Sequence, residues 1–209
     1  MTPKNLVIAG AVALALTAVI FLSIRSTAPT VPESALVLPA PEPVPAFSLL
    51  NQDGDKVDQS VFVGQWDLVF FGFTHCPDIC PATLQVLTTA KRTLADMGQE
   101  PLPRIVLVSV DPERDTPEIL GQYVDYFGDG NLGLTGTMEE IRKLTMGLGV
   151  YFEKRGTDAD NYVVDHWAGV YVIDPDGRRH SLISSPHVVD NYAVSYTHLT
   201  LPTTDVVCR

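Results

Sequence analysis

Two cysteines separated by three residues, Cys76-Pro-Asp-Ile-Cys80, are the clearest candidates for chemistry in this sequence. They follow a run typical of a buried strand and precede a predicted helix. At such a junction the backbone N–H groups and the helix dipole lower thiol pKa values, and the thiolate is the form that binds soft metals and attacks disulfides. This spacing lets both sulfurs face one metal ion and also form a disulfide after a modest rearrangement. The alternative interpretation is a structural disulfide or two inert buried thiols.

Two sulfurs rarely complete a metal site in a protein, so a third ligand is expected among the histidines. The candidates are His75, His166, His180, His187 and His198. We favour His166 because it stands just before the predicted strand 169–173, which in a thioredoxin-like layout lies across from the cysteine loop. Two thiolates and one imidazole suit Cu(I), and further nitrogen or oxygen ligands would suit Cu(II). The neighbouring Asp165 is a candidate to orient the imidazole ring.

The elements that must position these side chains are visible as short apolar runs, which predict strands covered on both faces. These runs are 67–73, 104–110 and 169–173. Between them, the pattern predicts three helices: from Pro81 to about Met97, from Thr116-Pro117 onward, and from a capping box at Thr137–Glu140 to Gly147 or Gly149.

Two turn sequences complete the predicted domain. Asn51–Gly54 and Asp174–Gly177 each separate short strand-like segments and therefore predict hairpins. A βαβ unit, further helices and a terminal hairpin together indicate an α/β domain with a mixed central sheet.

The N-terminal part differs in composition from the rest of the chain. Residues 6–24 are 19 consecutive uncharged positions between Lys4 and Arg25, long enough at about 1.5 Å per residue for a transmembrane helix. We predict an uncleaved anchor rather than a signal peptide, with residues 1–5 in the cytoplasm. The proline-rich residues 25–45 predict an extended linker, and residues 46–193 the folded domain.

The charge of the chain excludes one large class of function. The formal net charge is −11, and the charged residues before position 46 cancel one another, so the excess of negative charge falls on the folded part. Nucleic-acid binding needs a basic face that neutralises phosphates. We therefore expect no nucleic-acid partner.

Three separated segments closely resemble the Sco/SenC family. They are Phe70–Ala82 around the cysteines, Val108–Pro117, and Asp165-His166, in the family's order within about Phe47 to Tyr192. Members are membrane-anchored, thioredoxin-like copper proteins that help to assemble the binuclear copper centre of cytochrome c oxidase. The resemblance implies a three-layer thioredoxin-like fold, copper bound by Cys76, Cys80 and His166, and a redox-active cysteine pair.

The resemblance also implies a biological setting. The protein is expected to be a metallochaperone rather than an enzyme, held in the bacterial inner membrane by a single helix, with its domain in the periplasm. Its expected partners are the copper-site subunit of cytochrome c oxidase, other copper carriers and thiol–disulfide reductants.

Two other functions remain open from the residues alone. One is a thiol–disulfide oxidoreductase that uses Cys76 and Cys80 to reduce the cysteines of the target, which would need the thiols but not His166. The other is a thioredoxin-like binding module that has lost both chemistries, although the presence of all three candidate ligands counts against it.

Two features near the motifs call for an interpretation of their own. In Val108–Pro117 we predict a scaffold role, with Asp111-Pro112 ending a strand, Arg114 and Asp115 solvated or paired locally, and Thr116 capping a helix. Trp167 stands where the family more often has a small hydroxyl residue, so we expect its indole to cover the site or to contact a partner.

The end of the chain departs from the expected pattern. An amphipathic helix is expected after Tyr192, but residues 194–209 include Pro202, several β-branched residues and no helical stripe. Our hypothesis is that this tail is not native sequence and that it replaces the closing helix. The alternative is a real tail that forms an edge strand and leaves Cys208 free for an intermolecular bond.

Overall fold

The computed structural model describes residues 16–17, 35–156 and 162–200, and for residues 198–200 the backbone alone. The chain divides into two compact units, residues 1–31 and 32–209, and the description below concerns the second unit. Within the described ranges, no helix is both long and apolar enough to cross a bilayer. The predicted residues 1–5, anchor 6–24 and first part of the linker fall almost entirely outside these ranges.

The core of the domain is an eight-stranded mixed sheet with the order β1-β10-β9-β4-β5-β6-β2-β3. The central strand β4 runs parallel to β5, and β5 runs parallel to β6, while the other neighbours pair antiparallel. The mixed sheet predicted from the apolar runs is therefore confirmed. The strands are β1 (Ala35–Pro43), β2 (Leu49–Asn51), β3 (Lys56–Val57), β4 (Asp67–Gly72), β5 (Arg104–Ser109), β6 (Leu132–Thr135), β9 (Val170–Ile173) and β10 (Arg178–Ile183).

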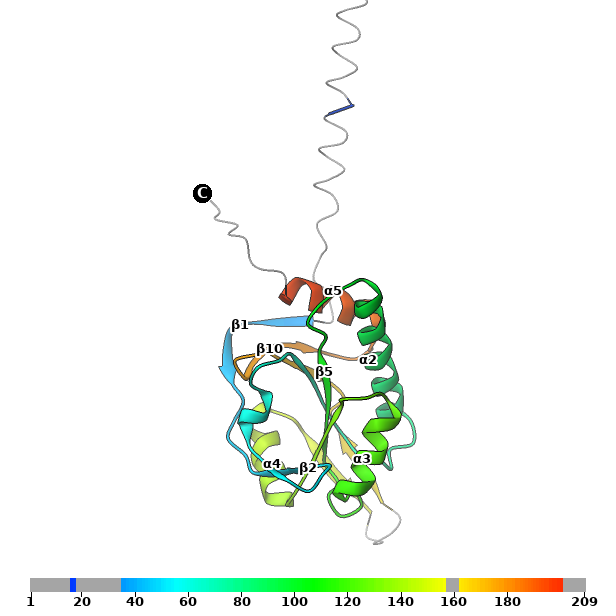
Figure 1. Cartoon of the computed structure of the whole chain (residues 1–209). Coiled ribbons are helices and arrows are strands. Elements are labelled where there is room, and N and C mark those ends of the chain that lie inside the picture. Colours follow the sequence, from blue (N-terminus) through cyan, green and yellow to red (C-terminus); the bar gives the residue numbers. More distant parts are fainter. Residues whose placement is uncertain (1–15, 18–34, 157–161, 201–209) are drawn as a thin grey trace, which may run out of the picture. The chain divides into compact units, whose positions relative to one another are not determined.

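Helices cover both faces of this sheet. Helices α2 and α3 lie on one side, as right-handed crossovers from β4 to β5 and from β5 to β6 require, and α4 lies on the other side (Figure 1). Helix α5 packs against α2. These three layers agree with the predicted thioredoxin-like α/β fold. The helices are the short 3₁₀ helix η1 (Gln59–Phe62), α2 (Ile79–Asp96), α3 (Pro117–Tyr126), α4 (Met138–Leu148) and α5 (Val189–Thr200).

The helix ends follow the predicted signals with two differences. Thr116 Oγ1 accepts a hydrogen bond from the Ile119 N–H, and Thr137 Oγ1 accepts one from the Glu140 N–H. The Glu140 carboxylate does not complete the capping box, because it accepts instead from the Ser48 N–H at 2.8 Å. Helix α2 begins at Ile79 rather than Pro81, which places the second cysteine of the pair in its first turn.

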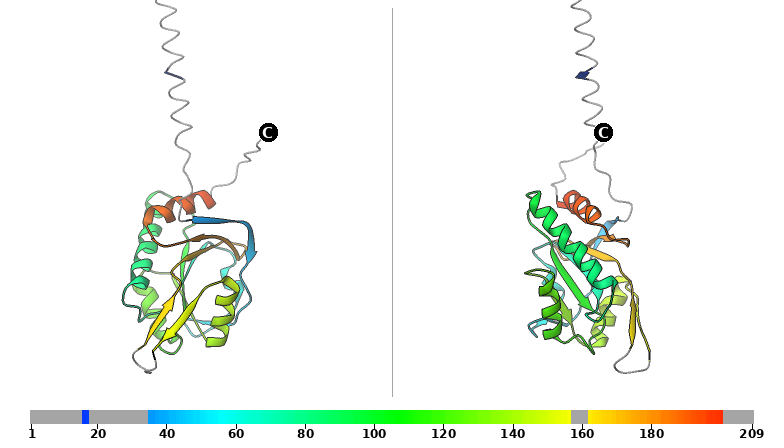
Figure 2. Two further views of the ribbon diagram at one scale, coloured as in Figure 1. Left: turned by 180° about the vertical axis from the view of Figure 1, so that it is seen from behind. Right: turned by 90° about the vertical axis from the view of Figure 1, so that its right-hand side faces the viewer.

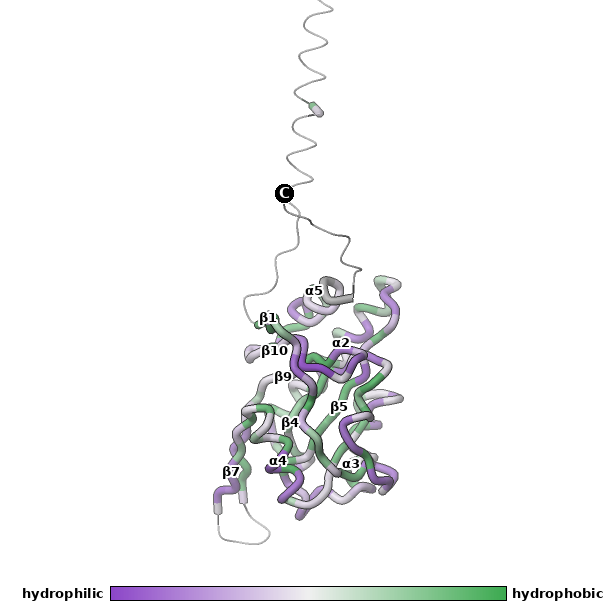
Figure 3. The backbone as a smooth tube through the Cα atoms, turned by 90° about the vertical axis from the view of Figure 1, so that its left-hand side faces the viewer, coloured by the Kyte–Doolittle hydropathy of each residue, from purple (hydrophilic) through white to green (hydrophobic). Residues whose placement is uncertain are grey.

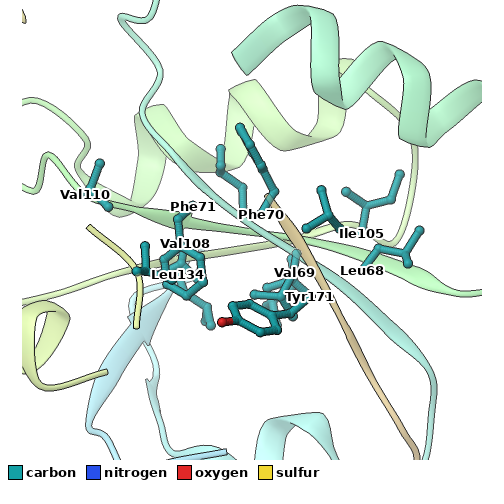
Figure 4. Packing of buried hydrophobic residues seen from close by; sticks show 14 of the residues in the cluster. Leu68, Val69, Phe70, Phe71, Ile105, Val108, Val110, Leu134 and Tyr171 are labelled. Atoms are coloured by element: carbon teal, nitrogen blue, oxygen red, sulfur yellow. The ribbon is translucent and has the colours of Figure 1, made fainter. Parts of the chain in front are cut away.

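The apolar runs form the core for the expected reason. All six residues of β4 are buried, since helices cover both of its faces. In Figure 4 the Phe70 ring projects from one face of the sheet, while Val69 and Tyr171 lie on the other. The sheet thus forms a rigid base, and β4 ends where the cysteine turn begins.

The predicted linker over residues 25–45 is wrong for its second part. Residues 35–43 form β1, which pairs antiparallel with β10 at the edge of the sheet, and Val44 is buried. Arg179 on β10 also pairs with Glu42. Prolines are tolerated here because an edge strand need not donate every N–H to a neighbour. The folded domain therefore begins before residue 46.

We predicted that residues 194–209 replace the closing helix, but the structure has a helix up to Thr200, so this prediction is wrong for residues 194–200. Helix α5 continues through Val194, and Tyr196 is buried edge-on to Trp66, with its hydroxyl donating to the Pro101 carbonyl at 2.5 Å. Packing of this kind outweighs the weak helical pattern and the modest cost of β-branched residues. Residues 201–209, with Cys208, lie outside the described ranges, so a non-native origin of the tail remains a hypothesis.

Strand β1 leads to a prediction about truncation. A chain that begins at Pro32 should fold like the full domain, whereas one that begins at Ala46 should melt about 5 °C lower or more, because it exposes the edge of β10 and the contacts of Val44. Thermal unfolding of the two fragments, followed by circular dichroism, measures the difference. Equal melting temperatures would mean that β1 adds nothing to the stability of the domain.

Candidate metal centre

The two cysteines lie on the turn that joins β4 to α2. The Cys76 N–H donates to the Phe73 carbonyl at 3.3 Å, and the Cys80 N–H donates to Cys76 Sγ at 3.4 Å. Cys80 is fully buried and Cys76 is 9% exposed. The thiols are not joined in a disulfide. The predicted position, at the carboxyl end of a buried strand and the start of a helix, is confirmed for both residues.

His166 reaches the cysteines from a separate hairpin. It ends β8 (Val163–His166), which pairs with β7 (Phe152–Arg155) in a two-stranded sheet. This hairpin forms the yellow strands at the edge of the domain in Figure 2 and carries the β7 label in Figure 3. His166 Nε2 lies 3.3 Å from Cys80 Sγ, and the ligand atoms of Cys76, Cys80 and His166 all lie within 4.8 Å of one another.

The His166 ring is oriented by a backbone group. Its Nδ1 lies 3.1 Å from the Trp167 carbonyl, which can only accept a hydrogen bond, so the ring carries its proton on Nδ1. This leaves the Nε2 lone pair free to face the sulfurs. Asp165, predicted as a candidate for this role, instead pairs with Arg155 at 2.5 Å across the hairpin.

The electrostatic setting makes the two thiols unequal. The pKa of Cys76 is lowered well below its usual range, first because the Cys80 thiol donates to its sulfur, and also because the backbone N–H groups of Asp78 and Cys80 donate to it. The same hydrogen bond and the burial of Cys80 raise the pKa of Cys80. Cys76 is thus the reactive thiolate, and release of the Cys80 proton gives two soft sulfur ligands beside an imidazole.

The other candidate histidines lie elsewhere or have other partners. His75 is half exposed, with Nδ1 3.0 Å from Thr74 Oγ1. His180 lies edge-on to Trp66, and His187 contacts the Ala168 carbonyl and the Tyr192 hydroxyl. The side chain of His198 lies outside the described ranges. Among the histidines whose side chains are described, the structure brings His166 to the cysteines.

An aromatic wall and a glycine enclose the centre. Phe70 and Phe73 both lie edge-on to His166, with ring centroids 5.8 and 5.7 Å away. A Cβ atom at Gly72 would stand 2.8 Å from Cys80 Sγ and 2.8 Å from Phe70 Cε1. Our sequence interpretation missed Gly72, although a glycine inside a buried strand is itself a signal of close approach.

The Val108–Pro117 segment has the predicted scaffold role, but one assignment within it is wrong. Arg114 pairs locally with Asp111, as expected. Asp115 is instead fully buried and accepts hydrogen bonds from the Thr74 N–H at 3.1 Å, the Thr74 hydroxyl at 2.5 Å and the Ser109 hydroxyl at 2.6 Å. It therefore ties the end of β5 to the turn that carries Cys76.

Trp167 packs against residues that follow it in the chain rather than pointing fully into solvent. Its indole is partly buried and lies against Gly169, where a Cβ atom would come within 2.0 Å of it, and it contacts the Tyr171 ring at 5.5 Å. The lack of a side chain at position 169 therefore makes room for this tryptophan. A contact between Trp167 and a partner remains a prediction.

Gly72 provides a test of how tightly the centre is packed. We expect Gly72→Ala to displace Cys80 or Phe70, because the added methyl group overlaps both, and to lower the affinity for a thiol-binding metal about tenfold or more. Competition with a chromogenic chelator measures this, and Gly121→Ala, in helix α3 where the added Cβ atom would stand 3.3 Å from Gln52 Cβ, serves as the control for the substitution itself. An unchanged affinity would show that Cys80 Sγ can move away from the added methyl group without weakening metal binding.

Comparison of the sequence with known proteins identifies its family. The SCO1/SenC family profile matches residues 38–199. The mitochondrial protein SCO2 homolog of Mus musculus is 42% identical over 132 residues, which are 63% of this chain and 52% of that protein, so the chain spans about half the length of this relative.

Solved structures give the same result for the fold. Arabidopsis thaliana ScoI with copper bound is 34% identical, with a TM-score of 0.69 over 76% of this chain and 99% of that chain. BsSco, described with a disulfide switch and as a member of the Sco family of cytochrome c oxidase assembly proteins, is 25% identical, with a TM-score of 0.60 over 78% of this chain and 96% of that chain. The chain belongs to the SCO1/SenC family.

Proposed function

We propose that this protein binds copper through Cys76, Cys80 and His166 and delivers it to the binuclear copper centre of cytochrome c oxidase. The observation that carries the proposal is the convergence of two sulfurs and one imidazole nitrogen within 4.8 Å, from two elements far apart in the chain. Soft sulfur ligands favour Cu(I), and the imidazole with further oxygen or nitrogen ligands would also hold Cu(II).

Family membership supports the choice of metal and of target. Copper is present in the structure of the Arabidopsis relative, and the family of BsSco is described by its part in cytochrome c oxidase assembly. In this proposal the partner is the copper-site subunit of the oxidase, and residues 6–24 hold the protein in the bacterial inner membrane with the domain in the periplasm. Other copper carriers and thiol reductants would load and reduce the site.

The transfer itself would proceed by exchange of ligands. Cys76 is 9% exposed whereas Cys80 is fully buried, so the Cys76 sulfur is the one that an incoming thiolate can approach more easily. Each bond that the target forms to copper replaces one bond to this protein, and no ligand is oxidised in the exchange. Phe70 and Phe73 lie edge-on to the partly buried His166 and shield part of its ring from water, which favours the soft ligands until a partner docks.

A second function is favoured by the inequality of the two thiols. The Cys76 thiolate can attack a disulfide of the target, and Cys80 can then resolve the mixed disulfide, so the target gains two thiols while this protein forms the Cys76–Cys80 disulfide. Sulfurs within 4.8 Å of each other need a further approach to the bond length of about 2 Å, which requires only local movement of the turn. The disulfide switch of BsSco supports this alternative.

Copper titration of wild type and His166→Ala distinguishes the two functions. We expect His166→Ala to weaken copper binding by about 100-fold or more, because a ligand is lost, while the Cys76–Cys80 disulfide still forms. His75→Ala is the matched control, since His75 adjoins Cys76 but contacts Thr74 instead of the thiols. Normal thiol exchange without tight copper binding by the wild type would favour the oxidoreductase, and unchanged copper affinity in His166→Ala would remove His166 from the ligand set.

A further inference from the structure

The hairpin that carries His166 is outside the main sheet. Within the described ranges, β7 and β8 pair with each other and not with any strand of the eight-stranded sheet. In Figure 3, β7 stands at the side of the domain. Backbone pairing with the sheet therefore does not place His166 itself, which is joined to β9 through residues 167–169. Side chains that attach the hairpin to the rest of the domain therefore contribute to its distance from the thiols.

One buried tyrosine makes the most specific of these attachments. Tyr162, directly before β8, is 6% exposed, and its hydroxyl donates to Asp111 Oδ1 at 2.5 Å. Arg114 donates to Asp111 Oδ2 at 2.5 Å and to the Tyr162 carbonyl at 3.4 Å, and its guanidinium lies 3.7 Å from the centre of the Tyr162 ring. We call these three residues the Asp111–Arg114–Tyr162 cluster. Asp111 and Arg114 thus hold Tyr162 by its hydroxyl, its ring and its backbone carbonyl.

The first strand of the hairpin is attached to the same loop. Lys154 on β7 lies 3.8 Å from the centre of the Tyr162 ring, on which Arg114 also stacks, and pairs with Glu113 at 2.6 Å. Cations favour the face of an aromatic ring, and the hydrogen bonds to the Asp111 carboxylate are charge-assisted. Lys154 on β7 and Tyr162 directly before β8 thus both contact the segment between β5 and α3.

The cluster also contacts an aromatic residue beside the cysteines and His166. The Arg114 guanidinium lies 5.6 Å from the centre of the Phe73 ring, and Phe73 in turn lies edge-on to His166 at 5.7 Å. The Phe73 carbonyl accepts from the Cys76 N–H. Arg114 therefore lies between the base of the hairpin and the residue from which the cysteine turn starts.

We infer that the Asp111–Arg114–Tyr162 cluster holds the β7–β8 hairpin against the cysteine turn and thereby sets the distance of His166 from the two thiols. The three are positioning residues, since none of them supplies a ligand atom. This inference rests on the proposed function for its consequence, copper affinity, but not for its geometric content. A cluster with only a structural role would affect stability without acting through His166.

A double-mutant cycle on the full-length chain tests this inference. Tyr162→Phe removes the hydroxyl bond and keeps the ring, and Arg114→Gln removes the stacking and the charge. Each is made with His166 and with His166→Ala, and copper affinity is measured by chelator competition. We expect each variant to lower the affinity about tenfold when His166 is present and to leave it unchanged when His166 is absent.

The control is Tyr151→Phe, which removes the hydroxyl bond to Glu153 at the exposed start of the same hairpin. We expect Tyr151→Phe to leave the copper affinity unchanged, both with His166 present and with His166→Ala. Equal losses with and without His166 would overturn the inference, and so would the absence of any loss. If Arg114→Gln fails to fold, Tyr162→Phe carries the test.

A second measurement separates failure of this inference from failure of the proposed function. If the wild-type protein binds no copper, the proposed function is wrong, and the ¹⁵N chemical shifts of the His166 ring in the reduced, metal-free protein then decide the positioning role. We expect these shifts to change in Tyr162→Phe and Arg114→Gln but not in Tyr151→Phe. Unchanged shifts in all three variants would overturn the inference.

Discussion

Replacement of either cysteine of the centre by serine is expected to abolish tight copper binding and all dithiol chemistry. A serine hydroxyl keeps the shape of the thiol, but it is a hard ligand and stays protonated at neutral pH. Either variant also leaves one sulfur beside His166, too few soft ligands to hold Cu(I) tightly. We expect the affinity of Cys76→Ser and of Cys80→Ser to fall by at least about 1,000-fold. Chelator competition under reducing conditions measures this.

The two substitutions should differ in a second respect. In Cys80→Ser the serine hydroxyl can still donate to the Cys76 sulfur, so Cys76 should keep a lowered pKa and react readily with an alkylating reagent at neutral pH. In Cys76→Ser the remaining thiol is fully buried and should react slowly with any alkylating reagent. Cys208→Ser is the matched control and should bind copper like wild type. Wild-type copper affinity in Cys76→Ser or Cys80→Ser would contradict the proposal that both sulfurs bind the metal.

Much of the centre could be predicted because its signals are local. The cysteine spacing and the junction between an apolar run and a helix start all lie within Asp67–Met97, and the structure confirms each of them. Likewise the caps at Thr116 and Thr137 depend on residues three positions away. Short-range hydrogen bonds and periodic burial leave a pattern that a single sequence displays.

The features that could not be predicted depend on contacts between distant residues. The sequence favours His166 because it precedes the strand at residues 169–173, and the structure confirms this position, but the strand β8 that His166 ends was not predicted, and its contact with Cys80 joins residues 86 positions apart. The hairpin itself gave no signal, because three of the four residues of β7 are exposed and charged. The burial of Asp115 depends on Thr74, 41 positions away, so the local sequence suggests a solvated residue.

Edges of the domain were the other source of error. Proline-rich β1 looks like a linker because its pairing with β10 uses only one side of the strand. Helix α5 has a weak stripe because it meets the domain mainly along α2 and a few large side chains such as Tyr196. At edges, a single packed face stabilises a segment whose local propensity is poor.

Asp115→Ala is expected to lower the free energy of unfolding by about 3–5 kcal/mol, the largest effect on stability among the scaffold residues. The carboxylate is fully buried, and its loss leaves the Thr74 N–H, the Thr74 hydroxyl and the Ser109 hydroxyl without their acceptor. Hydrogen bonds to a charged group contribute about 1.5–3 kcal/mol each, and burial of that charge offsets part of the sum. Urea denaturation of the metal-free, reduced protein measures the change.

The same substitution should also disturb the centre, since Thr74 lies two residues before Cys76 and loses the contact that fixes its backbone. Asp125→Ala, on the exposed face of the following helix, is the matched control and should change the free energy of unfolding by less than about 0.5 kcal/mol. Thr74→Val and Ser109→Ala each remove one hydroxyl donor and should each cost less than Asp115→Ala, because the carboxylate keeps its other partners. If Asp115→Ala unfolds at the same urea concentration as Asp125→Ala, the network around this carboxylate does not stabilise the cysteine turn.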